Sequence, residues 1–164
     1  MRKIMPYILK HTVVLLLLLV GVSAYGQMKL QGISLNLPIS EFQRQLESNG
    51  WRYSSTDEKG LIQYTRSELW GLKNVKAVIF PNNNYIKQVN LAWENKASFF
   101  DYMFKIIKNE FGEKYEITQD YDYGGSGWSK QYSWKIQGGE IFVWGLVTTS
   151  PPVQNNLIVW FVNE

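Results

Sequence analysis

Paired carboxylates are the side chains of this chain whose spacing could support catalysis. Asp120 and Asp122 are separated by one residue, and Glu113 and Glu116 come shortly before them. Glycoside hydrolases use two carboxyl groups at a fixed separation, one of which protonates the leaving oxygen. Nothing in the sequence marks any of these four carboxyl groups as desolvated, so we expect them to be surface charges beside a turn.

Residues that support other chemistries are missing or wrongly spaced. The 164 residues include no cysteine, and the one histidine, His11, lies in an N-terminal segment that we expect to be removed. Without His and Cys, the mature chain cannot form a Ser-His-Asp or Cys-His relay or the usual zinc and copper sites. Ser129 and Lys130 are adjacent and would point to opposite faces of a strand, which excludes a dyad between them.

The glycine-rich segment 120–127 does not match a cation loop or a phosphate loop. Its first residues resemble the start of a calcium loop, but Gly124 stands where a third ligand belongs and no glutamate follows at the required distance. Strand-like residues follow Gly127, where a phosphate loop would open a helix. The sequence therefore predicts a non-catalytic protein with no metal and no cofactor.

The first 26 residues have the features of a signal peptide. Arg2, Lys3 and Lys10 are followed by an apolar run over residues 12–22, and small residues then stand at the positions that a signal peptidase reads. The apolar run is only about half of the roughly 20 residues that cross a bilayer, so we expect cleavage and no stable membrane span afterwards.

Cleavage near Tyr25 or Gln27 would leave an exported protein, periplasmic or extracellular. It is not expected to be a lipoprotein, because the chain has no cysteine to carry the lipid. Loss of three basic residues with the leader reduces the seventeen Lys and Arg to fourteen, equal to the fourteen Asp and Glu. A neutral protein has no electrostatic reason to bind nucleic acid or anionic lipid.

Two amphipathic segments predict helices. In the first, Ser40 would cap the N-terminus with Gln43 completing a capping box, and Asn49-Gly50 would end the helix. The second helix is expected over residues 98–111, with Ser98 as its N-cap. Its large apolar residues recur at intervals of three and four and should face the core: Phe100, Met103, Phe104, Ile107 and Phe111.

Strands are expected where apolar and polar residues alternate between turn signals. Residues 81–84, Pro-Asn-Asn-Asn, form such a signal, and loops are expected over 119–129 and 148–156. The predicted strands cover residues 28–35, 61–66, 75–80, 86–93, 115–118, 131–137, 140–147 and 157–162.

The two parts of the mature chain, about 28–95 and 96–164, resemble each other. Residues 75–93 align with residues 140–161 if the later segment has a few extra loop residues. The sequence therefore predicts a single α+β domain over residues 27–164, built as a tandem α-β-β-β repeat. We expect an antiparallel sheet with two helices on one face.

Short motifs near the mature N-terminus carry a resemblance to known proteins. Gly-Ile-x-Leu at 32–35, Ile-x-x-Phe at 39–42, Leu46 and Gly50 resemble a family of small, signal-bearing bacterial proteins of unknown function. The tandem layout resembles the beta-lactamase-inhibitor-protein-like fold, which is close to the fold of the small outer-membrane assembly lipoproteins. The second resemblance is one of topology alone, and the missing lipobox cysteine departs from those lipoproteins. The resemblance to these folds implies a binding surface on a sheet, without catalysis.

The strand expected over residues 86–93 has one apolar and one polar face. Val89, Leu91 and Trp93 alternate with Gln88 and Asn90, which is typical of a sheet with one side in water.

The last two expected strands have no such polar face, because apolar residues also occupy their outward positions. Inward positions hold Ile141, Val143, Leu157, Val159 and Phe161, and outward positions hold Phe142, Trp144, Leu146, Ile158, Trp160 and Val162.

Two explanations for these outward residues remain open. The first strand, a long loop or the other half of the repeat could cover them. Alternatively, Phe142, Trp144, Ile158 and Trp160 form an aromatic surface for a partner. The expected loop over residues 120–128 would present further rings at a sheet edge, those of Tyr121, Tyr123 and Trp128.

The sequence thus favours a non-catalytic binding module that recognises a protein or another cell-envelope component through a sheet face or a loop. A carbohydrate-binding module is the alternative, because seven tryptophans could stack on sugar rings. A carboxylate-based hydrolase is the third hypothesis.

Overall fold

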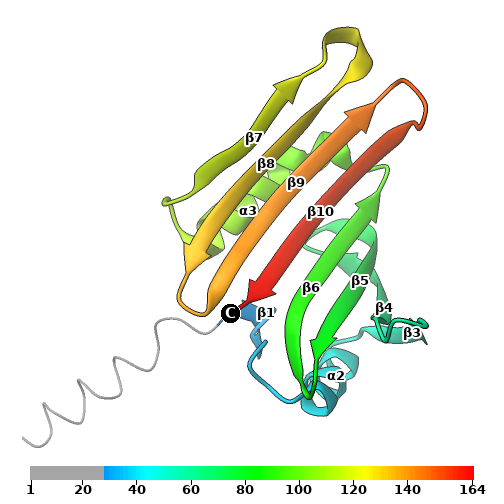
Figure 1. Ribbon diagram of the computed structural model, residues 1–164, viewed down its shortest axis with the longest axis vertical. Helices are drawn as coiled ribbons and strands as arrows, with labels where there is room; N and C mark the ends of the chain where they lie inside the picture. Colours follow the sequence, from blue (N-terminus) through cyan, green and yellow to red (C-terminus); the bar gives the residue numbers. More distant parts are fainter. Residues whose placement is uncertain (1–27) are drawn as a thin grey trace, which may run out of the picture.

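One antiparallel sheet of eight strands organises the computed structural model, which describes residues 28–164 (Figure 1). The strand order is β3-β4-β5-β6-β10-β9-β8-β7, so β6 and β10 pair at the centre and β3 and β7 form the edges. The predicted signal peptide lies outside the described residues. The strands are β3 (Arg52–Thr56), β4 (Ile62–Leu69), β5 (Leu72–Asn82), β6 (Tyr85–Glu94), β7 (Glu116–Asp122), β8 (Gly127–Ile136), β9 (Gly139–Thr148) and β10 (Gln154–Asn163).

Two helices accompany the sheet, and each precedes four consecutive strands. Helix α2 (Ile39–Ser48) comes before β3 to β6, and α3 (Phe100–Phe111) comes before β7 to β10. A small hairpin of β1 (Lys29–Leu30) and β2 (Ile33–Ser34) replaces the single strand expected at the start. The α+β class is confirmed. The α-β-β-β unit is wrong in its strand count, because four strands follow each helix, and the individual strands expected after the second helix already numbered four.

The overlooked strand of the first half is β3. All five of its residues are exposed and its sequence, Arg-Tyr-Ser-Ser-Thr, has no apolar alternation. An edge strand pairs on one side only and here buries neither face, so the hydrophobic pattern that reveals other strands is absent.

Both helices pack on the same face of the sheet, as expected. Tyr64 of β4 points to this face and hydrogen-bonds with Gln43 and Glu47 of α2 at 3.3 and 3.1 Å. Phe100 of α3 packs on Tyr132 of β8, at 5.4 Å between ring centroids. All the inward residues predicted on the three central strands are fully buried there, namely Val89, Leu91, Trp93, Ile141, Val143, Leu157, Val159 and Phe161.

The helix starts differ from those predicted, because neither serine caps its helix. Helix α2 begins one residue before Ser40, after Pro38, whose carbonyl accepts from the Phe42 N–H at 3.0 Å. The Ile39 N–H instead donates to the Asn84 carbonyl at 2.8 Å. Ser98 lies within a short 3-10 turn, η1 (Ala97–Phe99), that precedes α3. A contact with the distant β5–β6 turn therefore sets the start of α2, and the local capping motif does not reveal it.

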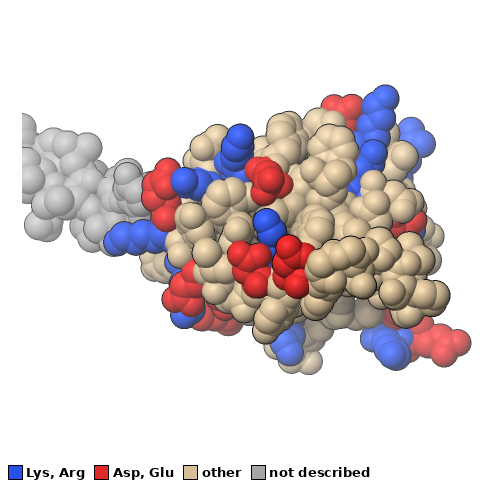
Figure 2. All heavy atoms as spheres, turned by 90° about the horizontal axis from the view of Figure 1, so that it is seen from above, with Lys and Arg blue, Asp and Glu red and all other residues tan. Residues whose placement is uncertain are grey.

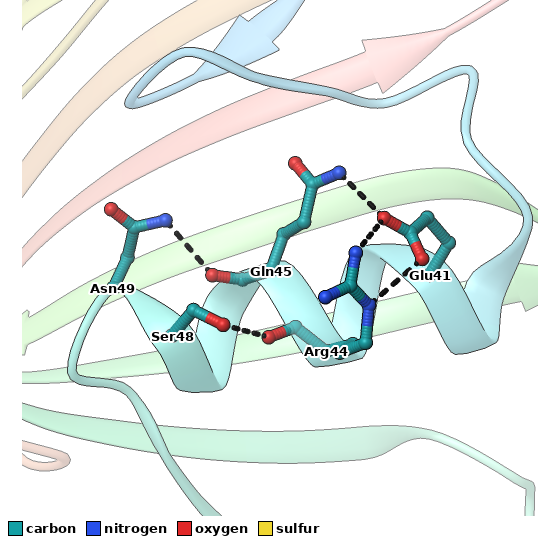
Figure 3. A network of polar contacts seen from close by, with 5 residues as sticks. All are labelled: Glu41, Arg44, Gln45, Ser48 and Asn49. Atoms are coloured by element: carbon teal, nitrogen blue, oxygen red, sulfur yellow. Dashed lines mark hydrogen bonds and ion pairs between the residues drawn. The ribbon is translucent and has the colours of Figure 1, made fainter.

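A polar network stabilises the exposed side of α2 (Figure 3). The Arg44 guanidinium donates two hydrogen bonds to the Glu41 carboxylate, at 2.6 and 3.0 Å, and the Gln45 amide donates a third at 2.8 Å. The Arg44 hydrogen bond, then that of Gln45, lowers the pKa of Glu41 to about 2. Glu41 also lies in the first turn, where a negative charge suits the helix dipole.

We expect Ile107→Ala to destabilise the protein by about 2–5 kcal/mol, because Ile107 is completely buried between α3 and the sheet. Phe104→Ala should cost a similar amount, since its ring packs on Tyr132 and Trp134 at 4.8 and 5.8 Å. Urea titration measures both. Lys105→Ala, at an exposed position of the same helix, is the control and should change stability by less than about 0.5 kcal/mol. Losses below about 1 kcal/mol for both core variants would mean that α3 is peripheral.

The Glu41 network should make part of the stability depend on acid pH. A carboxyl group with a lowered pKa in the folded state contributes stability above its unfolded pKa, and this is lost as the pH falls through its folded pKa. For Glu41 this window runs from about 4.5 down to about 2. A carboxyl-carbon NMR titration should place the Glu41 midpoint near the lower value. Glu41→Gln should remove this contribution to the pH dependence of the unfolding free energy. Glu58→Gln, at an exposed turn position, is the control and should leave the contribution in place.

Candidate functional site

The face of the sheet opposite the helices, here called the open face, carries a row of large apolar side chains. The viewer of Figure 1 looks onto this face, and α3 lies behind the sheet. The side chains expected at outward positions of β9 and β10 are partly exposed, whereas their inward neighbours are buried. They are continued on β5 by two further partly exposed apolar residues, Val78 and Phe80.

Four of these residues form the open-face cluster: Phe142, Trp144, Ile158 and Trp160. The register of β9 and β10 sets Trp160 opposite Phe142 and Ile158 opposite Trp144. The indole rings of Trp144 and Trp160 stack at 5.8 Å with an angle of 21° between their planes. Phe142 meets Trp160 edge-on at 5.9 Å and 71°. The four residues named from the sequence are therefore neighbours on one face, and within residues 28–164 they lie outside the core.

Two buried serines of β8 lie beside the open-face cluster. The Ser129 hydroxyl accepts hydrogen bonds from the Trp144 indole N–H at 3.1 Å and from the Gln119 amide of β7 at 2.9 Å. Ser133 stands opposite Phe142 and is equally buried, but within the described chain its hydroxyl has no hydrogen-bond partner. Neither serine was predicted to contact the cluster: Ser129 was considered only for a dyad with Lys130 and Ser133 not at all, because a small polar residue on a strand ordinarily indicates a solvated position.

Neutral polar residues border the open-face cluster, and charged residues lie further out. Gln88 and Asn90 of β6 flank it on one side and Gln131 of β8 on the other. The charged residues of this face include two exposed ion pairs, Lys76 with Glu94 and Lys135 with Glu116. The centre of the open face is thus apolar and uncharged. The end of the molecule that is seen from above, turned 90° from the open face, carries both acidic and basic side chains among uncharged ones (Figure 2).

The remaining predicted site residues lie elsewhere, because most of the expected loop over 119–129 is a hairpin. Strand β7 continues to Asp122 and β8 begins at Gly127, with a 3-10 turn, η2 (Gly124–Ser126), between them. Tyr121 and Tyr123 are exposed and stack on each other at 6.3 Å at this end of the hairpin.

Trp128 points to the helix side of the sheet. Its ring packs edge-on against Phe100 at 5.8 Å and lies over Gly145, where an added Cβ would come within 2.8 Å of it. Trp128 therefore does not join Trp144 and Trp160, which point to the other face.

The carboxylates considered for catalysis separate into two groups. Glu113 and Glu116 form exposed ion pairs with Lys108 at 2.7 Å and Lys135 at 3.2 Å. The other two line a hollow of about 500 Å³ on the helix side: Asp120 and Asp122, together with Asp101 of α3, Trp128 and Lys130.

Within residues 28–164, no group of three or more His, Cys, Asp or Glu is placed to hold a metal ion. No helix of this part of the chain is long and apolar enough to cross a membrane.

No protein family, curated protein or solved structure matches the chain. What the protein does is therefore inferred from its own surfaces.

The two buried serines provide a matched test of the site. Ser129→Ala should destabilise the protein by about 1–2 kcal/mol, because it removes the partner of the Trp144 N–H and the Gln119 amide. Ser133→Ala should be neutral or slightly stabilising, since it removes a buried hydroxyl without a partner in the described chain. Urea titration of both variants measures the difference, and equal losses would contradict the arrangement.

Proposed function

We propose that this is an exported, non-catalytic binding module that recognises a protein partner through the open-face cluster. The observation that carries the proposal is a row of partly exposed aromatic and aliphatic side chains on a face that the helices do not cover. Aromatic anchors surrounded by polar residues are typical of protein interfaces. The leader sequence supports export to the periplasm or the extracellular space.

The packing of the rings favours a protein over a glycan. A sugar binds to the exposed face of an aromatic ring, but Trp144 and Trp160 stack on each other and Phe142 adds its edge. These contacts cover part of each ring face, so the cluster presents a broad and uneven apolar surface. Such a surface can bind the apolar side chains of a protein partner.

We further propose that the two halves of the domain descend from a duplicated unit of one helix and four strands. The equal order of elements in both halves supports this, as does the central pairing of β6 with β10, the last strand of each half. On the open face β6 presents Gln88 and Asn90, whereas β10 presents Val162 and Trp160 directly opposite them. In this proposal the second half has acquired the binding surface, and the layout is that of the beta-lactamase-inhibitor-protein-like fold.

Trp144→Ala and Trp160→Ala should each weaken binding to the native partner by about thirtyfold or more, because truncating a central aromatic anchor costs about 2 kcal/mol or more. The partner is captured by a photo-crosslinking phenylalanine analogue at position 142, where it replaces Phe142 of the cluster and leaves both tryptophans in place, using mature protein and an envelope extract from the source cells. The affinity of the purified partner is then measured by calorimetry. Both variants should keep the circular dichroism spectrum of the parent protein.

A crosslinker at Tyr85, which is exposed at the β5–β6 turn, is the matched control and should not capture the same protein. The proposal fails if the crosslinker at position 142 captures nothing specific. It also fails if a glycan array reveals saturable binding that both tryptophan variants abolish. Unfolding of either variant would instead place that indole in the core.

A further inference from the structure

The outer edge of β7 is open over the whole strand. β7 pairs only with β8, and no other described strand lies beside its second edge (Figure 1). Six of its seven residues are exposed, and Ile117 and Tyr121 expose 60% and 56% of their surface. The backbone N–H and C=O groups on this side are therefore available to an added strand.

The charge at this edge is acidic. β7 contains Glu116, Asp120 and Asp122 and no basic residue. Asp101 of α3 lies on the same hollow as the two aspartates, and Lys130 is the one basic residue that lines it. Among the described residues, none of these three aspartates is within 4.0 Å of a lysine or arginine nitrogen. Two negative charges thus remain uncompensated beside the edge.

We propose that the β7 edge is a second docking site, distinct from the open-face cluster, which binds an extended basic segment of a partner protein as an added strand. Alternate side chains of a strand point to the same face. Asp120 and Asp122 are two residues apart and both lie on the helix side. Two lysines or arginines two residues apart in the added strand would reach them, and the residue between would contact Tyr121 on the other face.

Charge complementarity is what selects this occupant. Backbone hydrogen bonds give an added strand its affinity without regard to sequence, and side chains at alternate positions give it specificity. A second copy adding β7 against β7 would bring aspartates together, which disfavours that pairing. An acidic or neutral segment would leave the uncompensated carboxylates without partners.

The experiment uses a ten-residue peptide that alternates lysine with threonine, titrated into the mature protein. Amide signals of β7 should shift in NMR spectra, and alternate β7 amides should become protected from hydrogen exchange. Affinity should fall several-fold between 50 and 200 mM salt, on the order of what screening of exposed charges produces. Trp160→Ala, on a strand that β8 and β9 separate from β7, should leave this binding unchanged, so failure of this proposal and failure of the open-face proposal are distinguishable.

Asp120→Asn with Asp122→Asn should weaken the peptide about tenfold, on the order expected for two exposed charge contacts. The amide at 122 keeps an oxygen that can accept from the Gly124 N–H, so the turn is retained. Glu58→Gln with Glu68→Gln removes the same charge from exposed positions near the other edge and should leave affinity unchanged. Thermal unfolding of both double variants checks that they are folded.

Three outcomes would overturn the proposal. The first is equal affinity in the parent and the Asp120→Asn, Asp122→Asn variant. In the second, a peptide with N-methyl groups on alternate residues binds as well, which would mean charge attraction without strand addition. In the third, sedimentation without peptide shows self-association that protects β7, so that another copy of the chain occupies the edge.

Discussion

The pairing of β6 with β10 is the contact on which the rest of the structure depends. It joins two four-strand meanders into one sheet, through a register that sets Leu91 opposite Val159 and Asn90 opposite Trp160. Because side chains alternate along a strand, this single register decides which residues of both halves share a face. A slip by one residue would expose Val159 and bury Trp160 among the helices. The apolar face under the helices and the aromatic open face are therefore consequences of the same pairing.

Periodicity made the centre of this sheet predictable. Strands buried under helices need an apolar residue at every second position, so the inward residues of β6, β9 and β10 were identified from sequence alone. Phe142, Trp144, Ile158 and Trp160 followed as their outward neighbours. The edges were less predictable, because β3 and most of β7 bury no side chain and leave no such pattern. Residues 119–122 of β7 were expected to form a loop for this reason.

Long-range contacts explain the other differences. Trp128 was expected on a flexible loop, but the helix side of β9 has a glycine at 145 whose missing side chain makes room for the indole. The start of α2 depends on the Asn84 carbonyl, more than forty residues away in the sequence. Neither relation can be inferred from local spacing, since both require knowledge of which strands are neighbours.

A shared hydrogen-bond acceptor, the Ser129 hydroxyl, connects the open-face cluster to strand β7. Ser129 accepts from Gln119 of β7 and from Trp144 of β9, so a single hydroxyl ties the edge strand to the indole across β8. The hydroxyl satisfies both donors, which a methyl group at position 129 would leave unpaired. The position of Trp144 on the open face is thus set by three strands, not by its own strand alone. Cross-strand stacking with Trp160 adds a further contribution of about 0.2–1 kcal/mol, which helps to hold a half-exposed aromatic surface in a single arrangement before any partner is bound.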